Sequence, residues 1–282
     1  MTLSEYRRTV ADQQLTFDVT DGGPPDAAEV AVLLHGFPQD RTSWNAVAAG
    51  LHAAGVRTLA PDQRGYSPRA RPGGRSAYRL SELVADVVAL VDAAGLQRVH
   101  VVGHDWGGAV AWALAARHPD RVASLTVLST PHPRAMMQAV RHSTQGLKSW
   151  YMLLFQLPLL PEALLAPTLE RSLTRSGLSA ASARHSAELM RAGALGPALG
   201  WYRALPASLR EKAARRVTVP TTYVWGSRDF ALGRTAAEAT ADGVTGPYRF
   251  VELDAGHWLP EERADDVVAA VLERVHPAGG TA

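Results

Sequence analysis

The chain has 282 residues, of which 46% are hydrophobic and 20% charged, a composition typical of a globular protein that buries a large core. Its formal net charge is only +2, and basic residues are scattered among acidic ones, which argues against a nucleic-acid surface or a polybasic membrane anchor. Cysteine is absent, so disulfides, thiolate metal sites and a cysteine nucleophile are excluded.

Short, apolar, β-branched runs recur along the chain, and each ends in turn residues. In chain order they cover residues 29–36, 56–62, 98–104, 124–130, 221–227 and 248–254. Runs that are apolar almost throughout predict strands buried on both faces of a mostly parallel sheet. Helical spacing over 80–95, with Ser81 as N-cap and Gly95 as stop, and an alanine-rich stretch over 107–120 predict intervening helices. The alternation predicts an α/β fold.

The alternation of strands and helices fails between residues 131 and 215. This segment is rich in Leu, Ala, Arg and Ser and contains no strand pattern. We therefore expect a helical lid domain over residues 131–215, inserted into an α/β core that is formed by residues 1–130 and 216–282.

The sequence "GHDWG" follows a strand pattern and opens a helix pattern, with Asp105 at its centre. A sharp strand-to-helix turn strains its central residue and presents that side chain above the edge of the sheet. The pentapeptide alone fits a helix-capping aspartate equally well. The strand that ends in His35-Gly36-Phe37-Pro38 favours catalysis, because the backbone N–H groups of Phe37 and Trp106 then form an oxyanion site.

Two later turns supply an acid and a histidine. Asp229 ends the strand pattern 221–227, and His257 follows the next strand, which gives the order nucleophile, acid, histidine. The turn after strand 124–130 carries no carboxylate, and Asp254 lies where it can simply start a turn. We therefore expect Asp229 to orient His257.

An aspartate at the elbow implies different chemistry from a serine. Its reference pKa is about 3.9, so Asp105 is already an anion at neutral pH and needs no base to attack a saturated carbon. The product is an alkyl ester on the protein. His257, oriented by Asp229, then activates the water that hydrolyses this ester.

Two tyrosines of the helical segment, Tyr151 in "KSWYMLLFQLP" and Tyr202 in "LGWYRAL", are each compatible with an ordinary buried aromatic residue. Over nearly its whole length, however, the chain resembles the epoxide hydrolases of the α/β-hydrolase superfamily. The motifs that carry the resemblance are "HGFP", "PDQRGYS", "GHDWGG", "WYMLLFQLP", "WYR", "WGSRD" and "GHW".

The resemblance implies that Tyr151 and Tyr202 bind and protonate the epoxide oxygen. It also implies Asp105 as nucleophile, Asp229 and His257 as the water-activating pair, and Phe37 and Trp106 as oxyanion donors. Apolar residues at the elbow and in the lid are expected to bind a hydrophobic substrate: Trp106, Phe37, Pro38, Trp150 and Phe155.

Two other functions remain open at this point. A haloalkane or haloacid dehalogenase uses the same aspartate nucleophile, and the Trp106 indole N–H is a potential halide donor. Dehalogenases, however, often have an asparagine after His-Gly, where this chain has Phe37, or an arginine near the nucleophile. A ligand-binding protein without activity is expected to lack one or more catalytic residues, whereas every expected residue is present here.

We expect no cofactor and no metal, because His100 and His104 fall on a strand and its turn without a third ligand nearby. The expected partners are a small hydrophobic epoxide and water, with no nucleic acid and no stable membrane insertion. The apolar stretch "WYMLLFQLPLL" is too short to span a bilayer, and the N-terminus lacks the apolar core of a signal peptide. A cytoplasmic protein is predicted, and a homodimer is left open.

Overall fold

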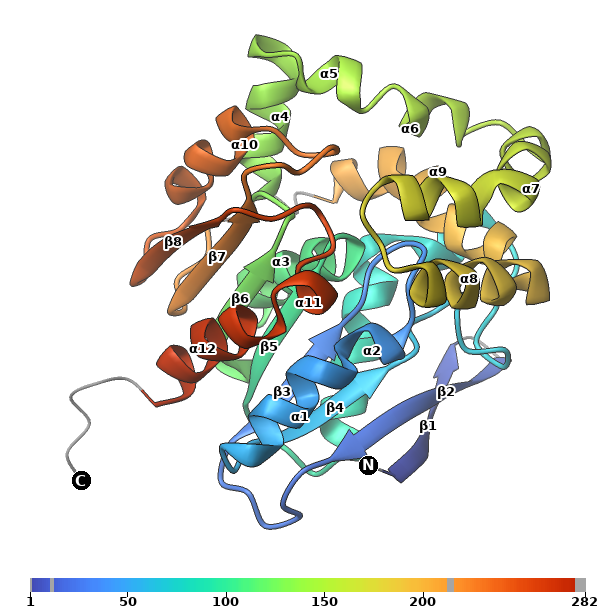
Figure 1. Ribbon diagram of the computed structural model, residues 1–282. Coiled ribbons are helices and arrows are strands. Elements are labelled where there is room, and N and C mark those ends of the chain that lie inside the picture. The colour runs from blue at the N-terminus through green and yellow to red at the C-terminus, as the bar shows by residue number, and fades with distance from the viewer. Residues whose placement is uncertain (1, 11–12, 212–215, 277–282) are drawn as a thin grey trace.

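The computed structural model describes residues 2–10, 13–211 and 216–276. Its centre is an eight-stranded sheet with the order β1-β2-β4-β3-β5-β6-β7-β8 (Figure 1). From β4 to β8 all neighbours are parallel, whereas β1 and β2 form an antiparallel hairpin whose second strand pairs with β4. The strands are β1 (Thr2–Val10), β2 (Gln13–Gly22), β3 (Val30–Leu34), β4 (Arg57–Pro61), β5 (Val99–His104), β6 (Val122–Leu128), β7 (Thr221–Gly226) and β8 (Tyr248–Leu253).

Burial on both faces confirms the predicted parallel strands, with one exception. On β3, Val32 and Leu34 belong to one apolar cluster while Leu33 belongs to the other, as the alternation of side chains along a strand requires. The strand β8 is parallel, as predicted, but the prediction that it is buried on both faces is wrong, because Arg249 and Glu252 are exposed. This strand lies at the edge of the sheet, so part of its surface faces solvent.

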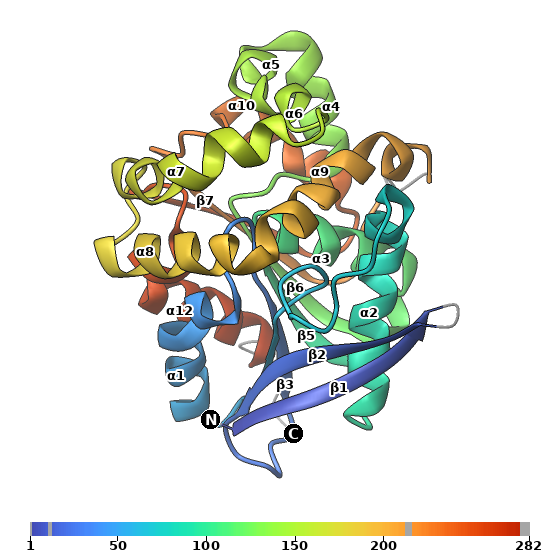
Figure 2. The ribbon, with the colours of Figure 1, turned by 90° about the vertical axis from the view of Figure 1, so that its right-hand side faces the viewer.

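Helices cover both faces of the sheet and complete an α/β-hydrolase fold. Figure 2 shows α1 and α12 on one side of the strands and α2 on the other, where α2 packs against α3. The bounds of these helices are α1 (Asn45–Ala53), α2 (Leu80–Ala93), α3 (Trp106–Arg117) and α12 (Ala264–Val275). Two short helices, α10 (Arg234–Glu238) and α11 (Leu259–Glu262), flank β8 in the chain.

The expected N-cap of the helix over 80–95 requires correction. Arg79, not Ser81, is the N-cap residue of α2, and its side chain makes no capping hydrogen bond. Instead the Glu211 carboxylate accepts from the Ser81 N–H at 3.2 Å and from the Ser81 hydroxyl at 2.7 Å. A carboxylate at a helix N-terminus satisfies free N–H groups and interacts favourably with the helix dipole. The cap therefore comes from a distant part of the chain.

Between β6 and β7 the described residues form helices and no strand, in agreement with the pattern of the sequence. The helices of this insertion are α4 (Pro133–His142), α5 (Gln145–Lys148), α6 (Tyr151–Leu154), α7 (Leu160–Arg175), α8 (Ala180–Leu189) and α9 (Leu195–Arg210), with a π-helical turn before α9. Figure 1 shows them gathered above the sheet. The domain boundaries at 131 and 215 stay predictions, and residues 212–215 lie outside the described part.

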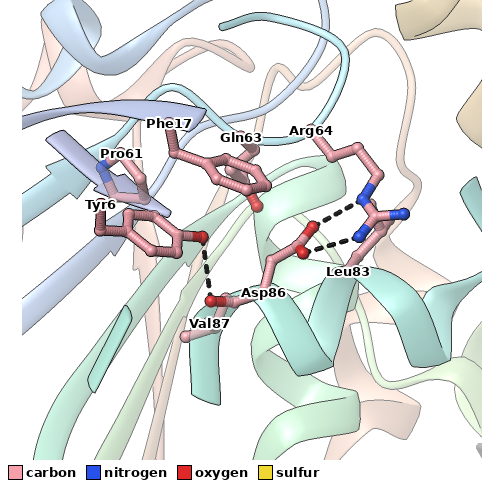
Figure 3. A pocket seen from close by; sticks show the side chains of 8 residues that line it. All are labelled: Tyr6, Phe17, Pro61, Gln63, Arg64, Leu83, Asp86 and Val87. Atoms are coloured by element: carbon pink, nitrogen blue, oxygen red, sulfur yellow. Dashed lines mark hydrogen bonds and ion pairs between the residues drawn. The ribbon is translucent and has the colours of Figure 1, made fainter. Parts of the chain in front are cut away.

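A buried ion pair anchors the turn after β4, which the insertion contacts. Arg64 is fully buried and donates from Nε and Nη2 to the two carboxylate oxygens of Asp86, both at 2.7 Å (Figure 3). The Tyr6 hydroxyl donates to the Asp86 backbone carbonyl at 3.0 Å. The indole of Trp201 in α9 donates to the Arg64 carbonyl at 2.8 Å. These contacts join the hairpin, α2 and α9 around one buried guanidinium.

Arg64→Ala should lower the free energy of unfolding by about 3–5 kcal/mol, because it leaves the Asp86 carboxylate buried with a weakened ion pair. The matched control is Arg57→Ala, which breaks a partly exposed pair with Asp21 and should cost no more than about 1 kcal/mol. Urea denaturation followed by circular dichroism measures both. Equal losses in the two variants would show that the buried ion pair contributes no more to the free energy of unfolding than the partly exposed one.

Candidate active site

The expected catalytic groups converge at one edge of the sheet. Phe37 follows β3, Asp105 follows β5, Asp229 follows β7 and His257 follows β8. These four strands run parallel, so their carboxyl ends lie at the same edge, where ligands of open α/β sheets bind. The fold thus brings together residues that are up to 220 positions apart (257 − 37).

The elbow strains Asp105. Its φ is 49° and ψ is −121°, a conformation that side chains rarely adopt. A Cβ on Gly103 would contact the Gly107 carbonyl oxygen, and a Cβ on Gly107 would contact the Leu34 carbonyl oxygen, so both positions require glycine. The Asp105 side chain makes no capping hydrogen bond to α3. Asp105 thus occupies the N-cap position of α3 without the side-chain hydrogen bond that a capping aspartate makes.

Backbone donors hold the Asp105 carboxylate. The Phe37 N–H donates to Oδ1 at 2.8 Å, and the Trp106 N–H also stabilises the charged form. Burial acts to raise the pKa of Asp105, but the hydrogen bond and charge of His257, together with the Trp106 N–H, outweigh it and lower the pKa. Asp105 is thus an anion at neutral pH, as predicted from its reference pKa.

Asp229 and His257 form a buried pair beside Asp105. His257 Nδ1 lies 2.8 Å from Asp229 Oδ2, while the N–H groups of Ala231 and Leu232 donate to Oδ1. His257 Nε2 faces Asp105 Oδ2 at 3.7 Å. The other carboxylate considered, Asp254, is exposed and pairs with an arginine, so it does not orient the histidine.

The two carboxylates control the charge of His257. Burial lowers the pKa of this imidazole, but the charges and hydrogen bonds of Asp229 and Asp105 outweigh burial and raise the pKa to about 10. With Asp105 as a free carboxylate, His257 is therefore protonated at neutral pH.

Positioning groups that the sequence analysis missed surround the pair. The His257 carbonyl accepts from His104 Nε2 at 2.8 Å and from the Ser129 hydroxyl at 2.9 Å. Burial, followed by the charge of His257, lowers the pKa of His104 to about 4, so His104 stays neutral. The Thr130 hydroxyl donates to the Asp105 carbonyl at 2.7 Å. Only their position next to the elbow and at the end of β6 could have indicated these residues.

Asp105 lies in a cavity of about 450 Å³ between the sheet edge and the insertion. Trp106, Tyr151 and Tyr202 line the same cavity, so the structure brings both predicted tyrosines into the cavity of Asp105, the predicted nucleophile. The remaining lining is mostly apolar and comes largely from α2, α4, α6 and α9: Leu80, Leu83, Met136, Met137, Val140, Met152, Leu205 and Leu209. A cavity of this kind, with a few converging polar groups, is typical of a small-molecule site.

The two tyrosines stay protonated. Burial, followed by the charge of Asp105, raises the pKa of both phenols above the ordinary value, so each can donate a hydrogen bond at neutral pH. Their ring centroids lie 6.2 Å apart. The rings of Trp106 and Tyr202 pack edge to face, with their centroids 4.9 Å apart.

Four residues expected to bind substrate lie outside the lining of the cavity. Phe155 packs on the rings of Phe37 and Tyr202 and does not line the cavity. Pro38 follows Phe37 in the same turn. Trp150 is 63% exposed and lies at the outer surface, so its predicted role requires correction. The sequence analysis instead missed the methionine pair of α4, Met136 and Met137, whose signal was the amphipathic spacing of that helix.

Neither a metal site nor a membrane span is found in the part of the chain that the structure describes. No group of three or more His, Asp or Glu side chains there could hold a metal ion. Likewise, none of the described helices combines the length and apolar character needed to cross a bilayer.

Comparisons with known proteins agree with this geometry. The α/β hydrolase fold family matches residues 30–264. Epoxide hydrolase A of Mycobacterium tuberculosis is 35% identical, over 94% of this chain and 96% of the relative. The AB hydrolase superfamily protein YfhM of Bacillus subtilis is 36% identical, over 92% and 94%. The crystal structure of epoxide hydrolase A from Mycobacterium thermoresistibile superposes with a TM-score of 0.83 at 28% identity, covering 98% and 99% of the two chains.

The chain is therefore an enzyme that belongs to the α/β hydrolase fold family. Within that family it is a member of the epoxide hydrolases, which confirms the resemblance carried by its motifs.

Proposed function

We propose that the enzyme opens an epoxide to a vicinal diol through a covalent ester on Asp105. The observation that carries the proposal is the shared cavity, in which a strained carboxylate faces two protonated tyrosines. Attack at a saturated carbon needs a nucleophile such as the carboxylate. Departure of an epoxide oxygen needs a proton donor such as a tyrosine. We further propose that the helical insertion acts as a lid that supplies this donor.

In the first step, Oδ2 of Asp105 attacks an epoxide carbon and the carbon–oxygen bond of the ring breaks. Oδ1 is already held by the Phe37 N–H, so Oδ2 is the oxygen free to attack. The departing oxygen takes a hydrogen bond and then a proton from Tyr151 or Tyr202. The product is a hydroxyalkyl ester whose carbonyl oxygen already lies against the Phe37 N–H.

The second step uses His257 as a base, which requires that the imidazole lose its proton. The tyrosinate left by the first step takes up that proton, which restores the phenol. Ester formation neutralises Asp105 and so removes one of the two negative charges that raise the pKa of His257. His257 can then accept a proton from water, and the hydroxide attacks the ester carbonyl. The oxyanion is stabilised by the N–H groups of Phe37 and Trp106 until the ester carbon–oxygen bond breaks. The departing diol oxygen takes the proton from His257, and the Asp105 carboxyl then returns its proton to the imidazole. The base is thus activated by completion of the first step.

Asp105→Asn should lower the pKa of His257 below its value of about 10 in the unmodified enzyme, because the amide carries no charge. On raising the pH, the imidazole of the variant should therefore lose its proton first. NMR titration of ¹³C-labelled histidine measures both values, with His257→Gln to assign the resonance. An unchanged titration would contradict the proposed coupling.

A dehalogenase with the same nucleophile is less well supported. Two protonated phenols line the cavity of Asp105, and a departing halide, unlike an epoxide oxygen, does not require a proton donor. Scoring a panel of styrene oxide, a fatty epoxide and a bromoalkane for diol or bromide separates the two reactions. Because the cavity lining is mostly apolar, we expect a hydrophobic epoxide to give the highest rate. We also propose a cytoplasmic location, which a cysteine-free chain allows.

A single turnover in ¹⁸O-water, with enzyme in excess over epoxide, tests the covalent route. The oxygen added to the first diol should come from Asp105, so the diol should be unlabelled and the label should enter the aspartate. Mass spectrometry of the diol and of the peptide that contains Asp105 gives both results. Label in the first diol would mean that water attacks the epoxide directly, and the ester mechanism would be wrong.

A further inference from the structure

The outer face of the insertion exposes an unusual number of large apolar side chains. Leu147, Leu153 and Leu159 are 76%, 77% and 79% exposed. Together with three exposed neighbours they form what we call the α5–α7 patch: Leu147, Trp150, Leu153, Leu157, Leu159 and Leu164. Figures 1 and 2 both place α5 and α6 at the end of the molecule opposite β1. Large apolar side chains that are exposed close together on one segment indicate an interaction surface.

The chain segment that carries most of the patch contains basic residues and no carboxylate. The chain has no Asp or Glu between Asp120 and Glu162, and Glu162 itself is paired with Arg203. Arg141, His142 and Lys148 are exposed beside the patch. Among the described residues none of these three forms an ion pair with a carboxylate. The formal charge of the whole chain, close to zero, conceals this local excess of positive charge.

We propose that the α5–α7 patch is a docking surface for an anionic lipid bilayer. Leucine and tryptophan flanked by basic residues is the composition of segments that lie in the membrane interface. Each basic residue near an anionic surface contributes on the order of fivefold in affinity. Docking of this kind needs no spanning helix and is reversible, so it agrees with the expectation that the chain does not insert stably.

A second copy of the chain is a less suitable occupant. A twofold contact would place the patch against itself, since such interfaces use the same surface on both subunits. Arg141 and Lys148 of each copy would then approach their counterparts, and the segment 121–161 that carries most of the patch offers no Asp or Glu to pair with them. An anionic bilayer provides the missing negative charge.

The patch adjoins the mouth of the catalytic cavity. Met137, Val140 and Leu209 line the cavity and are also exposed, so the cavity reaches the surface beside α4. Arg141, next to Val140, belongs both to the cavity lining and to the basic surroundings of the patch. One consequence, which rests on the proposed function, is that a membrane-dissolved epoxide reaches Asp105 without crossing bulk water.

Trp150 provides a specific probe of docking. Of the seven tryptophans it is the one that is exposed; the others are buried or half-buried. Vesicles of phosphatidylcholine mixed with phosphatidylglycerol should therefore shift the tryptophan emission to shorter wavelength. Trp150→Phe should abolish the shift while the protein still sediments with the vesicles. Neutral phosphatidylcholine vesicles and high salt should each reduce binding.

Leu147→Ser with Leu153→Ser should remove vesicle binding, and Lys148→Glu should weaken it. These side chains are exposed, so the variants should fold, which circular dichroism checks. The matched control is Leu3→Ser on β1, an exposed leucine at the other end of the molecule, which should bind as the unmodified protein does. Asp105→Asn should also bind normally, so a failed docking assay is distinguishable from a failed catalytic mechanism.

The proposal is wrong if the protein stays in the supernatant with anionic vesicles, or if the double serine variant binds unchanged. Analytical ultracentrifugation covers the remaining alternative. A dimer that the double serine variant loses, without any vesicle binding by the unmodified protein, would assign the patch to self-association and overturn the proposal.

Discussion

His257→Gln should accumulate a covalent ester on Asp105 and lose turnover by about 10²–10⁴-fold. The Phe37 N–H still holds Oδ1 of Asp105 in this variant, so the carboxylate can still attack the epoxide. Hydrolysis of the ester stops because no base remains beside its carbonyl. Rapid quenching with excess epoxide, followed by peptide mass spectrometry, should show an increase equal to the mass of the epoxide on the Asp105 peptide.

The control for this experiment is the double variant Asp105→Asn with His257→Gln, which should give no adduct. Epoxide consumption by His257→Gln should show a burst no larger than one equivalent of enzyme, and diol release should show none, since deacylation limits the rate and is the step that frees the diol. An adduct on a different carboxylate, or a variant that turns over without any adduct, would contradict the assignment of Asp105 and His257.

Many residues of the candidate site could be predicted, because in a parallel sheet the residues that follow successive strands lie at the same edge. Parallel strands end at one edge, so a polar residue after each strand identifies a group that faces the site. The choice of Asp229 over Asp254 also followed from the order of turns. The sequence could not decide whether Asp105 is a functional aspartate or a helix cap. Only its φ and ψ angles and the absent capping hydrogen bond distinguish the two.

The direction of side chains on the insertion could not be predicted. Successive residues of a helix differ by about 100° around its axis, so neighbours of a cavity residue point elsewhere. Tyr151 lines the cavity, whereas Trp150 beside it faces outward. Similarly, Glu211 caps α2 from 130 residues away, a contact that no local pattern of Ser81 could indicate. The surface patch became visible only when those exposed side chains were placed together.

Tyr151→Phe combined with Tyr202→Phe should abolish epoxide opening, with a loss of about 10²–10⁴-fold. Both phenols are protonated and line the cavity of Asp105, so removing both hydroxyls leaves the departing oxygen without its proposed proton donors. Each single variant should lose less, because the other tyrosine still donates. Single-turnover kinetics with styrene oxide should locate the defect in ester formation, the opposite of His257→Gln.

Tyr78→Phe is the matched control, since Tyr78 also lines the cavity but its hydroxyl donates to the Pro72 carbonyl at 2.8 Å. It should lose far less activity than the double variant. If the double variant opens epoxides at a rate close to that of Tyr78→Phe, another group protonates the oxygen. If it loses epoxide opening but still releases bromide from a bromoalkane, the tyrosines are specific for the epoxide oxygen, because a departing halide requires no proton.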